Sequence, residues 1–486
     1  MIPALKPYPG YKDSSVQWLG AVPEHWEVRR MRNVAELRVS TIDKHVREDE
    51  LPVRLCNYVD VYKNDRIRPG MSFMSATARA EDISRFRLED GDVLITKDSE
   101  VWTDIGVPAL VEGRADDLVS GYHLALLRPR AQTCVGAFLL RALQSRPVAY
   151  QLHVEATGVT RYGLSHDAIK SVWLPAPPLP EQHSIVRYLD YMDRRIRRYI
   201  RTKQKVIKLL EEEKQGIIHR AVTGQVDVRT GQPYPTYKPS GVEWLGDVPA
   251  EWEVVPLKRA FVSLDYGVSE SATDHGNIRL LTMAHIRAGE VNVPESGGLS
   301  KVDRELTLQP GDLLFNRTNS LELVAKVGLF KGWETPVSFA SYLVRMRPRA
   351  PHRAEYLNML LNDIAFLRAA RREAIPSLHQ ANLNPTRYGR LPIPLPGEAE
   401  QSTIVEHLED EAARVNRAVE REARLIEFVR KYRTRLIADV VTGKLDVREA
   451  AALLPHEIEE PLQDAELPGD ESLEGEDLLE PEDADA

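Results

Sequence analysis

The sequence predicts an α+β protein with two tandem α/β domains, each followed by a long helix, and with the two helices packed antiparallel as a coiled coil about a pseudo-twofold axis. Three observations predict it. A helical segment occurs twice, at 181–222 and 400–441, and a lead-in segment occurs twice, at 8–28 and 234–254. Between each lead-in and its helix lies a region of mixed strand-like and helix-like patterns. The sequence therefore indicates an internal duplication of one structural unit.

The two lead-in segments establish the duplication. YPGYKDSSVQWLGAVPEHWEV and YPTYKPSGVEWLGDVPAEWEV are identical at 14 of 21 positions. Each holds two tryptophans with a proline between them, at a spacing that fits neither a helix nor a strand. We expect a loop or short turn that is pinned by buried aromatic rings.

The variable regions that follow, 29–174 and 255–391, share only scattered anchors. Residues 88–95 match residues 308–315, and each segment reads as a Gly-containing turn that leads into a buried strand. Short strand patterns mixed with helical ones, such as residues 356–372, predict an α+β domain with a twisted sheet.

The repeated helical segments lack proline and, apart from Gly216, glycine, and they place apolar residues every three or four positions. About 40 residues at 1.5 Å each give a rod of roughly 60 Å. Each apolar stripe has to be covered, and the other stripe is the obvious partner, although packing against another protein remains open. Lys203 and Glu213 interrupt the first stripe. The residues expected to pack and to set the spacing are Leu189, Met192, Ile196, Val206, Leu210, Leu408, Val415, Val419, Ile426 and Val429, with Ile185, Tyr199, Ile217, Ile404 and Leu436 in the same stripes.

Proline-rich joints stop each domain before its helix, because proline fixes an extended backbone. The helices end at Gly224 and Gly443, which suit left-handed caps. The expected boundaries are a lead-in at 1–28, a variable domain at 29–180, a helix at 181–224, a connector with the second lead-in at 225–254, a variable domain at 255–399, a helix at 400–443 and a tail at 444–486.

The charge of the chain is unevenly distributed. The formal net charge is −9, but residues 456–486 contain 14 Asp or Glu and no Lys or Arg, so the rest has 64 bases against 59 acids, or +5. This composition predicts a disordered tail. The tail either keeps the protein solvated or makes a contact in which it imitates the charge of nucleic acid. The first helix is strongly basic, which fits a solvated face or attraction to phosphate or an acidic partner. Its cations are Arg187, Arg194, Arg195, Arg197, Arg198, Arg201, Lys203, Lys205 and Lys208.

The sequence shows no signal peptide and no apolar run of membrane-spanning length, so we expect a cytoplasmic protein. Cys56 and Cys134 are 78 residues apart, which offers neither a zinc knuckle nor a disulfide framework. The phosphate-loop fragment 442–444 lacks the upstream glycine, and 384–387 lacks the second proline and the aromatic of a base-flipping tetrapeptide. We therefore expect no catalytic residue, no metal ligand and no bond chemistry in this chain.

Taken together, the tandem variable domains, the joint LPAPPLPEQ and the helix ends VTGQVDVR and VTGKLDVR closely resemble the specificity subunit of type I restriction-modification systems. The resemblance covers nearly the whole chain except the acidic tail, and residues 397–399 are an insertion before the second helix. It implies two target-recognition domains, each reading one half of a bipartite, asymmetric DNA sequence. It also implies that the helices set the spacer between the half-sites and dock two modification (methyltransferase) subunits.

The same resemblance implies that restriction subunits (translocase and nuclease) join the complex, which methylates adenine-N6 and defends against foreign DNA. S-adenosylmethionine, ATP and Mg are expected in the partner subunits and none in this chain. The alternative function is a coiled-coil adaptor that binds only protein, which the divergence of the domains on identical frames disfavours. A self-sufficient restriction enzyme is disfavoured by the missing motifs.

Candidate base contacts lie on loops near the shared anchors, where polar side chains can pair with base edges. An ordinary role as turn or surface residues remains open for each of them. After the anchor strands stand Thr96, Lys97, Ser99, Asn316, Arg317 and Asn319, and before the joints stand Arg161, Tyr162, His166, His379, Gln380 and Asn382.

Overall fold

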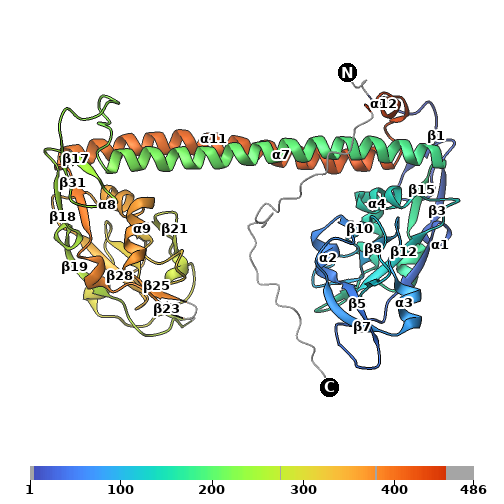
Figure 1. Cartoon of the computed structure of the whole chain (residues 1–486), viewed down its shortest axis with the longest axis horizontal. Helices are drawn as coiled ribbons and strands as arrows, with labels where there is room; N and C mark the ends of the chain where they lie inside the picture. The colour runs from blue at the N-terminus through green and yellow to red at the C-terminus, as the bar shows by residue number, and fades with distance from the viewer. Residues whose placement is uncertain (1–4, 274, 378–379, 456–486) are drawn as a thin grey trace. The chain divides into compact units, whose positions relative to one another are not determined.

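The computed structural model describes residues 5–273, 275–377 and 380–455. Contacts divide the chain into unit 1, Met1–Arg198 with Val429–Ala486, and unit 2, Tyr199–Phe428. Each unit contains one variable domain and part of each long helix, as the colours of Figure 1 show. The α+β class and the packing of the two long helices against each other are confirmed.

The two long helices are α7 (Leu179–Val222) and α11 (Glu398–Val441), and each has 44 residues. Both begin two residues before the predicted start. In α7 the early start is possible because proline is tolerated in the first turn of a helix, where its missing N–H has no partner to lose. In unit 2, Lys203 pairs with Glu422 at 2.7 Å and Lys214 donates to Asn416 at 3.1 Å, so the helices run antiparallel there.

The apolar stripes of the two helices are covered as predicted, with one exception. Tyr199 was expected in the stripe but is 40% exposed, because α7 turns that position toward solvent. Lys203, which interrupts the stripe, is accommodated by its ion pair with Glu422. Among the predicted packing residues, Leu189, Ile196, Leu408, Val415 and Ile426 are buried, and Met192, Val206, Leu210, Val419 and Val429 are half-buried.

Unit 1 is built around a five-stranded sheet with the central strand β8 (Val93–Thr96). The order of its strands is β4 (Ala35–Val39), β12 (Leu124–Pro129), β8, β10 (Pro108–Val111) and β6 (Arg66–Ile67). A second sheet contains β11 (Leu118–Ser120), β5 (Leu51–Cys56) and β7 (Met74–Ala78), and β3 (Glu27–Arg30) pairs with β15 (Trp173–Ala176). The short helices are α1 (Met31–Val34), α2 (Tyr58–Lys63), α3 (Ala80–Phe86), α4 (Gly136–Gln144), α5 (Arg146–Glu155) and α6 (His166–Ser171).

Unit 2 repeats this plan around the central strand β24 (Leu313–Asn316). Its main sheet has the order β19 (Phe261–Tyr266), β28 (Leu343–Pro348), β24, β26 (Val327–Leu329), β22 (Glu290–Val291) and β21 (Ile286–Arg287). The other strands are β23 (Gly298–Leu299), β20 (Ile278–Leu281) and β27 (Val337–Phe339) in one sheet and the pair β18 (Glu253–Pro256) and β31 (Pro392–Leu395). The short helices are η1 (Leu257–Ala260), η2 (Met283–His285), η3 (Arg304–Leu306), α8 (Ala354–Leu361), α9 (Ile364–Arg372) and α10 (Pro385–Tyr388).

The lead-ins form hairpins, not the loops that we expected. In unit 1, β1 (Tyr11–Asp13) pairs with β2 (Ala21–Pro23), and in unit 2, β16 (Tyr237–Pro239) pairs with β17 (Asp247–Pro249). The prediction missed strands of three residues, which are too short for an alternating pattern to be recognised. Trp26 in unit 1 is buried as expected, whereas Trp18, the other tryptophan of this lead-in, is 40% exposed.

The first lead-in packs against the C-terminal end of α11 within unit 1. The hydroxyl of Tyr11 donates to the carbonyl oxygen of Gly443 at 3.1 Å. The backbones of Lys6 and Asp446 form an isolated antiparallel β-bridge. Beyond α11, the helix α12 (Arg448–Ala452) buries Ala450 and Ala451 in the core of unit 1. The predicted tail at 444–486 therefore starts too early, because the apolar spacing around α12 forms a buried helix face. Residues 456–486 lie outside the described residues.

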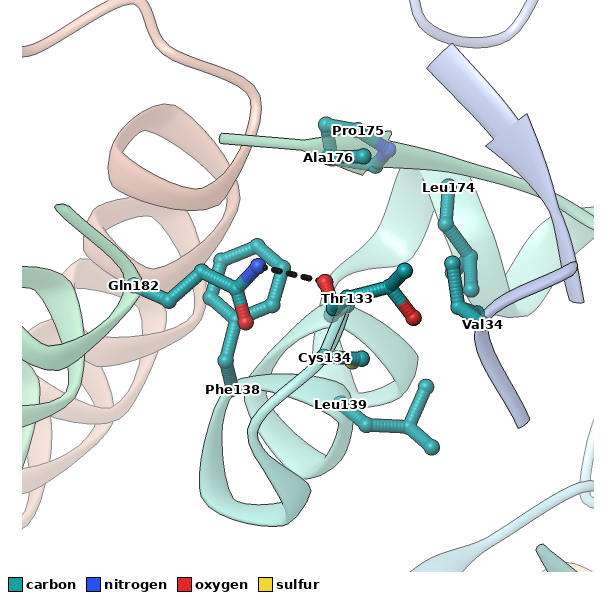
Figure 2. A pocket seen from close by; sticks show the side chains of 10 residues that line it. Val34, Thr133, Cys134, Phe138, Leu139, Leu174, Pro175, Ala176 and Gln182 are labelled. Atoms are coloured by element: carbon teal, nitrogen blue, oxygen red, sulfur yellow. Dashed lines mark hydrogen bonds between the residues drawn. The ribbon is translucent and has the colours of Figure 1, made fainter. Parts of the chain in front are cut away.

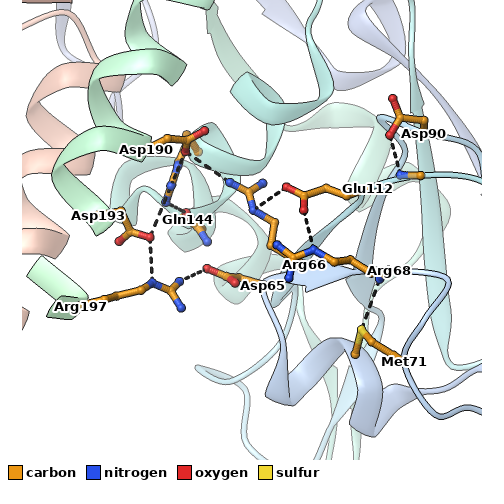
Figure 3. A network of polar contacts seen from close by, with 12 residues as sticks. Asp65, Arg66, Arg68, Met71, Asp90, Glu112, Gln144, Asp190, Asp193 and Arg197 are labelled. Carbon is orange, nitrogen blue, oxygen red and sulfur yellow. Dashed lines mark hydrogen bonds and ion pairs between the residues drawn. The ribbon is translucent and has the colours of Figure 1, made fainter. Parts of the chain in front are cut away.

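An ion-pair network fastens the first variable domain to α7 (Figure 3). Asp190 of α7 accepts from Arg141 Nη2 at 2.6 Å and from Arg66 Nη2 at 3.3 Å. Asp193 accepts from Arg197 Nε at 3.0 Å. Two further contacts of the network join Arg197 to Asp65 and Asp193 to Arg433 of α11.

Within this network, burial raises the pKa of Asp193, but the hydrogen bond and charge of Arg433, with the charges of Arg197 and Arg141, outweigh burial. The pKa of Asp193 is lowered to about 2 as a result. Asp193 is therefore ionised across the physiological range and anchors the domain to the helices of unit 1.

Candidate nucleic-acid interface

Both central strands start from the same rigid turn. Asp92, just before β8, accepts from Arg128 Nη2 at 2.7 Å, and Asp312, just before β24, accepts from Arg347 Nε at 2.8 Å. In both turns a glycine with positive φ precedes the aspartate, at 86° for Gly91. The repeated sequence anchor thus fixes where each central strand begins and where the loop after it emerges.

In unit 1 a small three-stranded sheet brings two distant candidate segments together. It contains β13 (Thr157–Gly158), β14 (Tyr162–Gly163) and β9 (Asp98–Ser99), in the order β13-β14-β9. Tyr162 pairs with Ser99, and Gly163 pairs with Asp98. The loop after the central strand and the segment before the joint are therefore neighbours in space.

Unit 2 contains the equivalent sheet. Its strands are β25 (Thr318–Asn319), β30 (Ala381–Asn382) and β29 (Ile375–Pro376), in the order β25-β30-β29. Thr318 pairs with Asn382 in the register. The side-chain amide of Asn382 also donates to Thr318 Oγ1 at 3.0 Å. Both units thus place a hairpin on the strand that follows the central one.

The hairpin of unit 1 presents an arginine that is held in place. Arg161 Nη2 donates to Asp98 Oδ1 at 2.8 Å, and His123 Nδ1 lies 2.9 Å from Asp98 Oδ2. Burial raises the pKa of Asp98, but the hydrogen bonds and charges of His123 and Arg161 outweigh it, so that the pKa lies below its ordinary value. An ionised Asp98 therefore orients Arg161, whose side chain is 44% exposed.

The turn of this hairpin projects from the domain. Val159, at the tip, is 91% exposed, and Arg161 closes the turn. Gly158 has a φ of 153°, and a Cβ at this position would lie 1.9 Å from the carbonyl oxygen of Arg161. Only glycine fits there, so the tip depends on this one residue.

In unit 2, the loop after β24 contributes an arginine to the corresponding surface. Arg317, after β24, lies over the ring of Tyr266, with 5.0 Å between the guanidinium carbon and the ring centroid. Gln380 is exposed at the hairpin turn, where the Ser377 amide donates to the Gln380 carbonyl at 2.6 Å. The two hairpins therefore occupy the same place in the sheet order and differ in turn length and in side chains.

Three residues on the list of candidate base contacts are buried, which corrects their assignment. Thr96 is fully buried and accepts from the Val107 amide at 3.0 Å, and Ser99 and Asn316 are also buried. Their positions at strand ends suggested exposure, but the packing of each domain buries them, so they do not face solvent.

The other candidates lie at or near the surface. In unit 1 they are Lys97, Arg161, Tyr162 and His166, of which Tyr162 packs partly against the core and His166 starts α6. In unit 2 they are Arg317, Asn319, Gln380 and Asn382. His379 lies outside the described residues.

The sequence pattern did not reveal all members of this surface. His123 was missed because it comes from the turn before β12. Asp98 lies in the candidate segment after β8 but was not chosen as a base contact, and only the fold brings both residues to Arg161. Tyr58 and Tyr62 stack at 5.5 Å between ring centroids on α2, and Tyr62 donates to Asp104 at 2.6 Å. The aromatic spacing of four residues was the one signal that could have pointed to this pair.

A pocket in unit 1, shown in Figure 2, is a packing seam and not a reaction site. The amide of Gln182 fills its polar side, donating to the carbonyls of Thr133 at 3.0 Å and Pro177 at 2.9 Å. The lining is otherwise almost entirely apolar. It consists of Val34, Thr133, Cys134, Phe138, Leu139, Ala142, Leu174, Pro175, Ala176 and Gln182.

Within the part of the chain that the structure describes, no three His, Cys, Asp or Glu side chains gather in a way that could hold a metal ion. Over the same residues, no helix is both long and apolar enough to cross a membrane. Burial raises the pKa of Cys134 to about 12, which keeps this thiol protonated and unreactive.

Comparison with known proteins points to one family. The family model described as type I restriction modification DNA specificity domain matches residues 23–209. The specificity subunit of type I restriction enzyme MjaVIII from Methanocaldococcus jannaschii is 20% identical over 88% of this chain and 94% of its own length. The EcoKI specificity subunit of Escherichia coli K12 is 22% identical over 90% of this chain and 95% of its own length.

A further relative, the putative MjaX specificity subunit of M. jannaschii, is 28% identical over 49% of this chain, and the chain spans about half (53%) of that relative's length. A solved chain described under complex assembly and conformational transition of the type I R-M system has a TM-score of 0.63 at 16% identity. The match covers 87% of this chain and 99% of that one, and it shows a shared fold. Residues 23–209 thus match the model of the type I restriction modification DNA specificity domain, and the chain is similar over most of its length to specificity subunits of type I restriction enzymes.

Proposed function

We propose that this chain is the non-catalytic DNA-recognition subunit of a type I complex, in which each unit reads one half of a bipartite, asymmetric target. The observation that carries the proposal is the pair of equivalent hairpins with different side chains. Hairpins at the same place in the order of the small sheets carry Arg161 in unit 1 and Gln380 with Asn382 in unit 2. Two half-sites of different sequence require recognition domains of similar fold that present different side chains to the bases.

The chemistry of the side chains supports different base preferences. An arginine pairs best with the O6 and N7 acceptors of guanine, whereas amides pair with the N6 and N7 edge of adenine. In unit 1, Asp98 holds Arg161 before DNA arrives, which reduces the entropy lost on binding. We infer that the hairpin of unit 1 reads a guanine and that the amides of unit 2 read an adenine.

The long helices carry the second part of the proposal. They set the number of unspecified base pairs between the half-sites and dock two modification subunits, and restriction subunits join this assembly. S-adenosylmethionine, ATP and Mg act in those partner subunits, and this chain contributes recognition. The spacing role is supported by the equal length of α7 and α11, which have 44 residues each in the two copies of the repeated unit.

The test is Arg161→Ala in the complex with the modification subunits. We expect affinity for the target to fall about tenfold to a hundredfold, in line with the loss of one bidentate base contact, and one position of the methylated target to become degenerate. Mobility shifts and mapping of methylated adenines measure the two effects. Arg114→Ala is the matched control, since Arg114 is an exposed arginine of unit 1 that pairs with Asp116 in a turn.

Unchanged affinity and an unchanged target in the Arg161 variant would remove the hairpin from the recognition surface. The rival function, a coiled-coil adaptor that binds only protein, predicts no salt-sensitive shift of target DNA even when the modification subunit is present.

A further inference from the structure

We propose that one loop in each unit reads thymine in the DNA target, through contact of exposed apolar side chains with the thymine methyl group. The two loops, here named the apolar loops, are residues 100–105 after β9 in unit 1 and residues 320–324 after β25 in unit 2. The inference rests on the proposed function and adds a second kind of base contact to the hydrogen bonds of the hairpins.

The apolar loops expose large apolar residues in both units. Val101 and Trp102 in unit 1 and Leu321 and Leu323 in unit 2 are 40% to 56% exposed. Single exposed apolar residues are common on protein surfaces and need no explanation. Two such residues at the same place in both copies of a duplicated domain, in regions that have otherwise diverged, indicate a surface that is covered when the protein acts.

The backbones of the two loops are closed in the same way. At the end of β8, the carbonyl oxygen of Thr96 accepts from the Gly106 amide at 2.9 Å. At the end of β24, the carbonyl oxygen of Asn316 accepts from the Ala325 amide at 2.9 Å. Gly106 and Ala325 both have positive φ, at 77° and 70°, which is uncommon for an alanine. The loops therefore leave and re-enter the two domains at equivalent points.

Each loop is held in place by its own domain. In unit 1, the hydroxyl of Tyr62 on α2 donates to Asp104 Oδ2 at 2.6 Å. In unit 2, Arg371 of α9 donates from Nε to the carbonyl oxygen of Val324 at 3.3 Å and from Nη2 to the carbonyl oxygen of Glu322. The apolar side chains are therefore presented on a fixed backbone, which reduces the entropy lost on binding.

The apolar loops are continuous with the hairpins that carry the proposed base contacts. Ser99 pairs with Tyr162 of the hairpin in unit 1, and Asn319 pairs with Ala381 of the hairpin in unit 2. The first exposed apolar residue follows two positions later in each unit, at most about 7 Å along the chain. DNA that is bound at the hairpins therefore lies within reach of the apolar loops.

The composition of the loops favours base edges over phosphates. Neither loop contains Lys or Arg, and each has one exposed glutamate, Glu100 in unit 1 and Glu322 in unit 2. Carboxylates repel phosphates, so the loops do not follow the DNA backbone. In the major groove, the apolar group that base edges offer is the methyl group of thymine, and a glutamate beside it can accept from the N4 amino group of cytosine.

The test uses the complex of the full chain with the modification subunits and a duplex that carries the target, as mapped by methylated adenines. Each thymine of the two half-sites is replaced in turn by deoxyuracil, which removes the methyl group and leaves the base pair intact. We expect at least one replacement in each half-site to weaken binding about fourfold, which is the effect of one buried methyl group. Mobility shifts measure the affinities.

Two double variants assign this effect to the loops. Val101→Ser with Trp102→Ser should weaken binding of the thymine-containing target about fourfold or more and remove the dependence on the methyl group in one half-site only. Leu321→Ser with Leu323→Ser should do the same in the other half-site only. Each variant is the control for the other, because a loop that merely supported the fold would not abolish the methyl dependence of one half-site.

Val262→Ser is a further control at an exposed apolar residue of unit 2. Phe261, next to it in β19, pairs with Pro348 at one end of β28. Asn316, which precedes the apolar loop, pairs with Leu343 at the other end of β28. Val262 therefore lies at the far end of the sheet from the loop, and its variant should keep the methyl dependence of both half-sites. Circular dichroism and size-exclusion chromatography establish that the variants are folded and assembled.

Affinities that no replacement with deoxyuracil changes would overturn the inference and leave the proposed function intact. Loop variants that keep the methyl dependence in both half-sites would equally overturn it. Folded loop variants that fail to assemble with the modification subunits would make the loops a protein contact, which also contradicts the inference. No salt-sensitive shift of the target by the parent complex would refute the proposed function, and this inference with it.

Discussion

Single glycines decide whether a recognition hairpin can form. Gly158 lies where β13 turns toward β14, and a Cβ there would overlap the carbonyl oxygen of Arg161 at 1.9 Å. Gly163, in the paired strand, has no atom within 4 Å of the equivalent Cβ position. The two glycines of one hairpin therefore differ in function although they look alike in the sequence.

We predict that Gly158→Ala weakens binding of target DNA about tenfold or more. The added methyl group strains the backbone at a cost of about 1–3 kcal/mol, and the shift that relieves this strain displaces Arg161. The melting temperature should change little, since the hairpin strands contain two residues each. Mobility shifts and circular dichroism check both effects. Gly163→Ala is the control and should bind as the parent does. Equal loss of binding in both variants would contradict the explanation.

At the level of elements, a pair of the half-buried His219 and the buried Asp363 fastens α7 to the variable domain of unit 2. His219 Nδ1 lies 2.9 Å from Asp363 Oδ2, and Asp363 also caps α9 by accepting from the Ala365 and Phe366 amides. The hydrogen bond to Asp363 raises the pKa of His219 above its ordinary value of 6.5, against the opposing effect of burial.

A raised pKa in the folded state means that the pair stabilises unit 2 fully below pH 6.5 and loses that contribution as the pH rises through the folded pKa. We predict that the melting temperature falls more steeply from pH 6 to pH 9 in the parent than in His219→Gln, by a few degrees. His166→Gln, at an exposed position of unit 1, should keep the parent slope. Parallel pH profiles of the parent and His219→Gln would refute the assignment.

At the level of the whole molecule, the proposed spacing role of the helices makes a geometric prediction. Four residues inserted into one helix add about 6 Å and turn its stripe out of register with the other helix. We predict that the unspecified spacer lengthens or that assembly with the modification subunits is lost. Mapping of methylated adenines, with size-exclusion chromatography of the complex, measures these outcomes.

The matched variant inserts seven residues into both helices at opposed positions, after Lys208 and after Arg417. Seven residues keep the apolar stripe continuous and add about 10 Å, close to three base pairs of duplex. This variant should assemble normally and methylate a target with a longer spacer. An unchanged spacer with normal activity in either variant would refute the spacing role.

The sequence by itself determined the duplication, the α+β class and the two long helices, because these depend on local periodicity and on repeated anchors. The pairing of β9 with β14 and of β25 with β30 depended on the tertiary structure, since strands of two residues leave no alternating pattern. Tertiary packing also decided that Thr96 and Asn316 are buried and that α12 belongs to the core of unit 1. The contact of Asp98 with Arg161, across 63 residues of chain, likewise required the fold. Local patterns specify elements, whereas contacts between distant segments specify which side chains meet and which reach solvent.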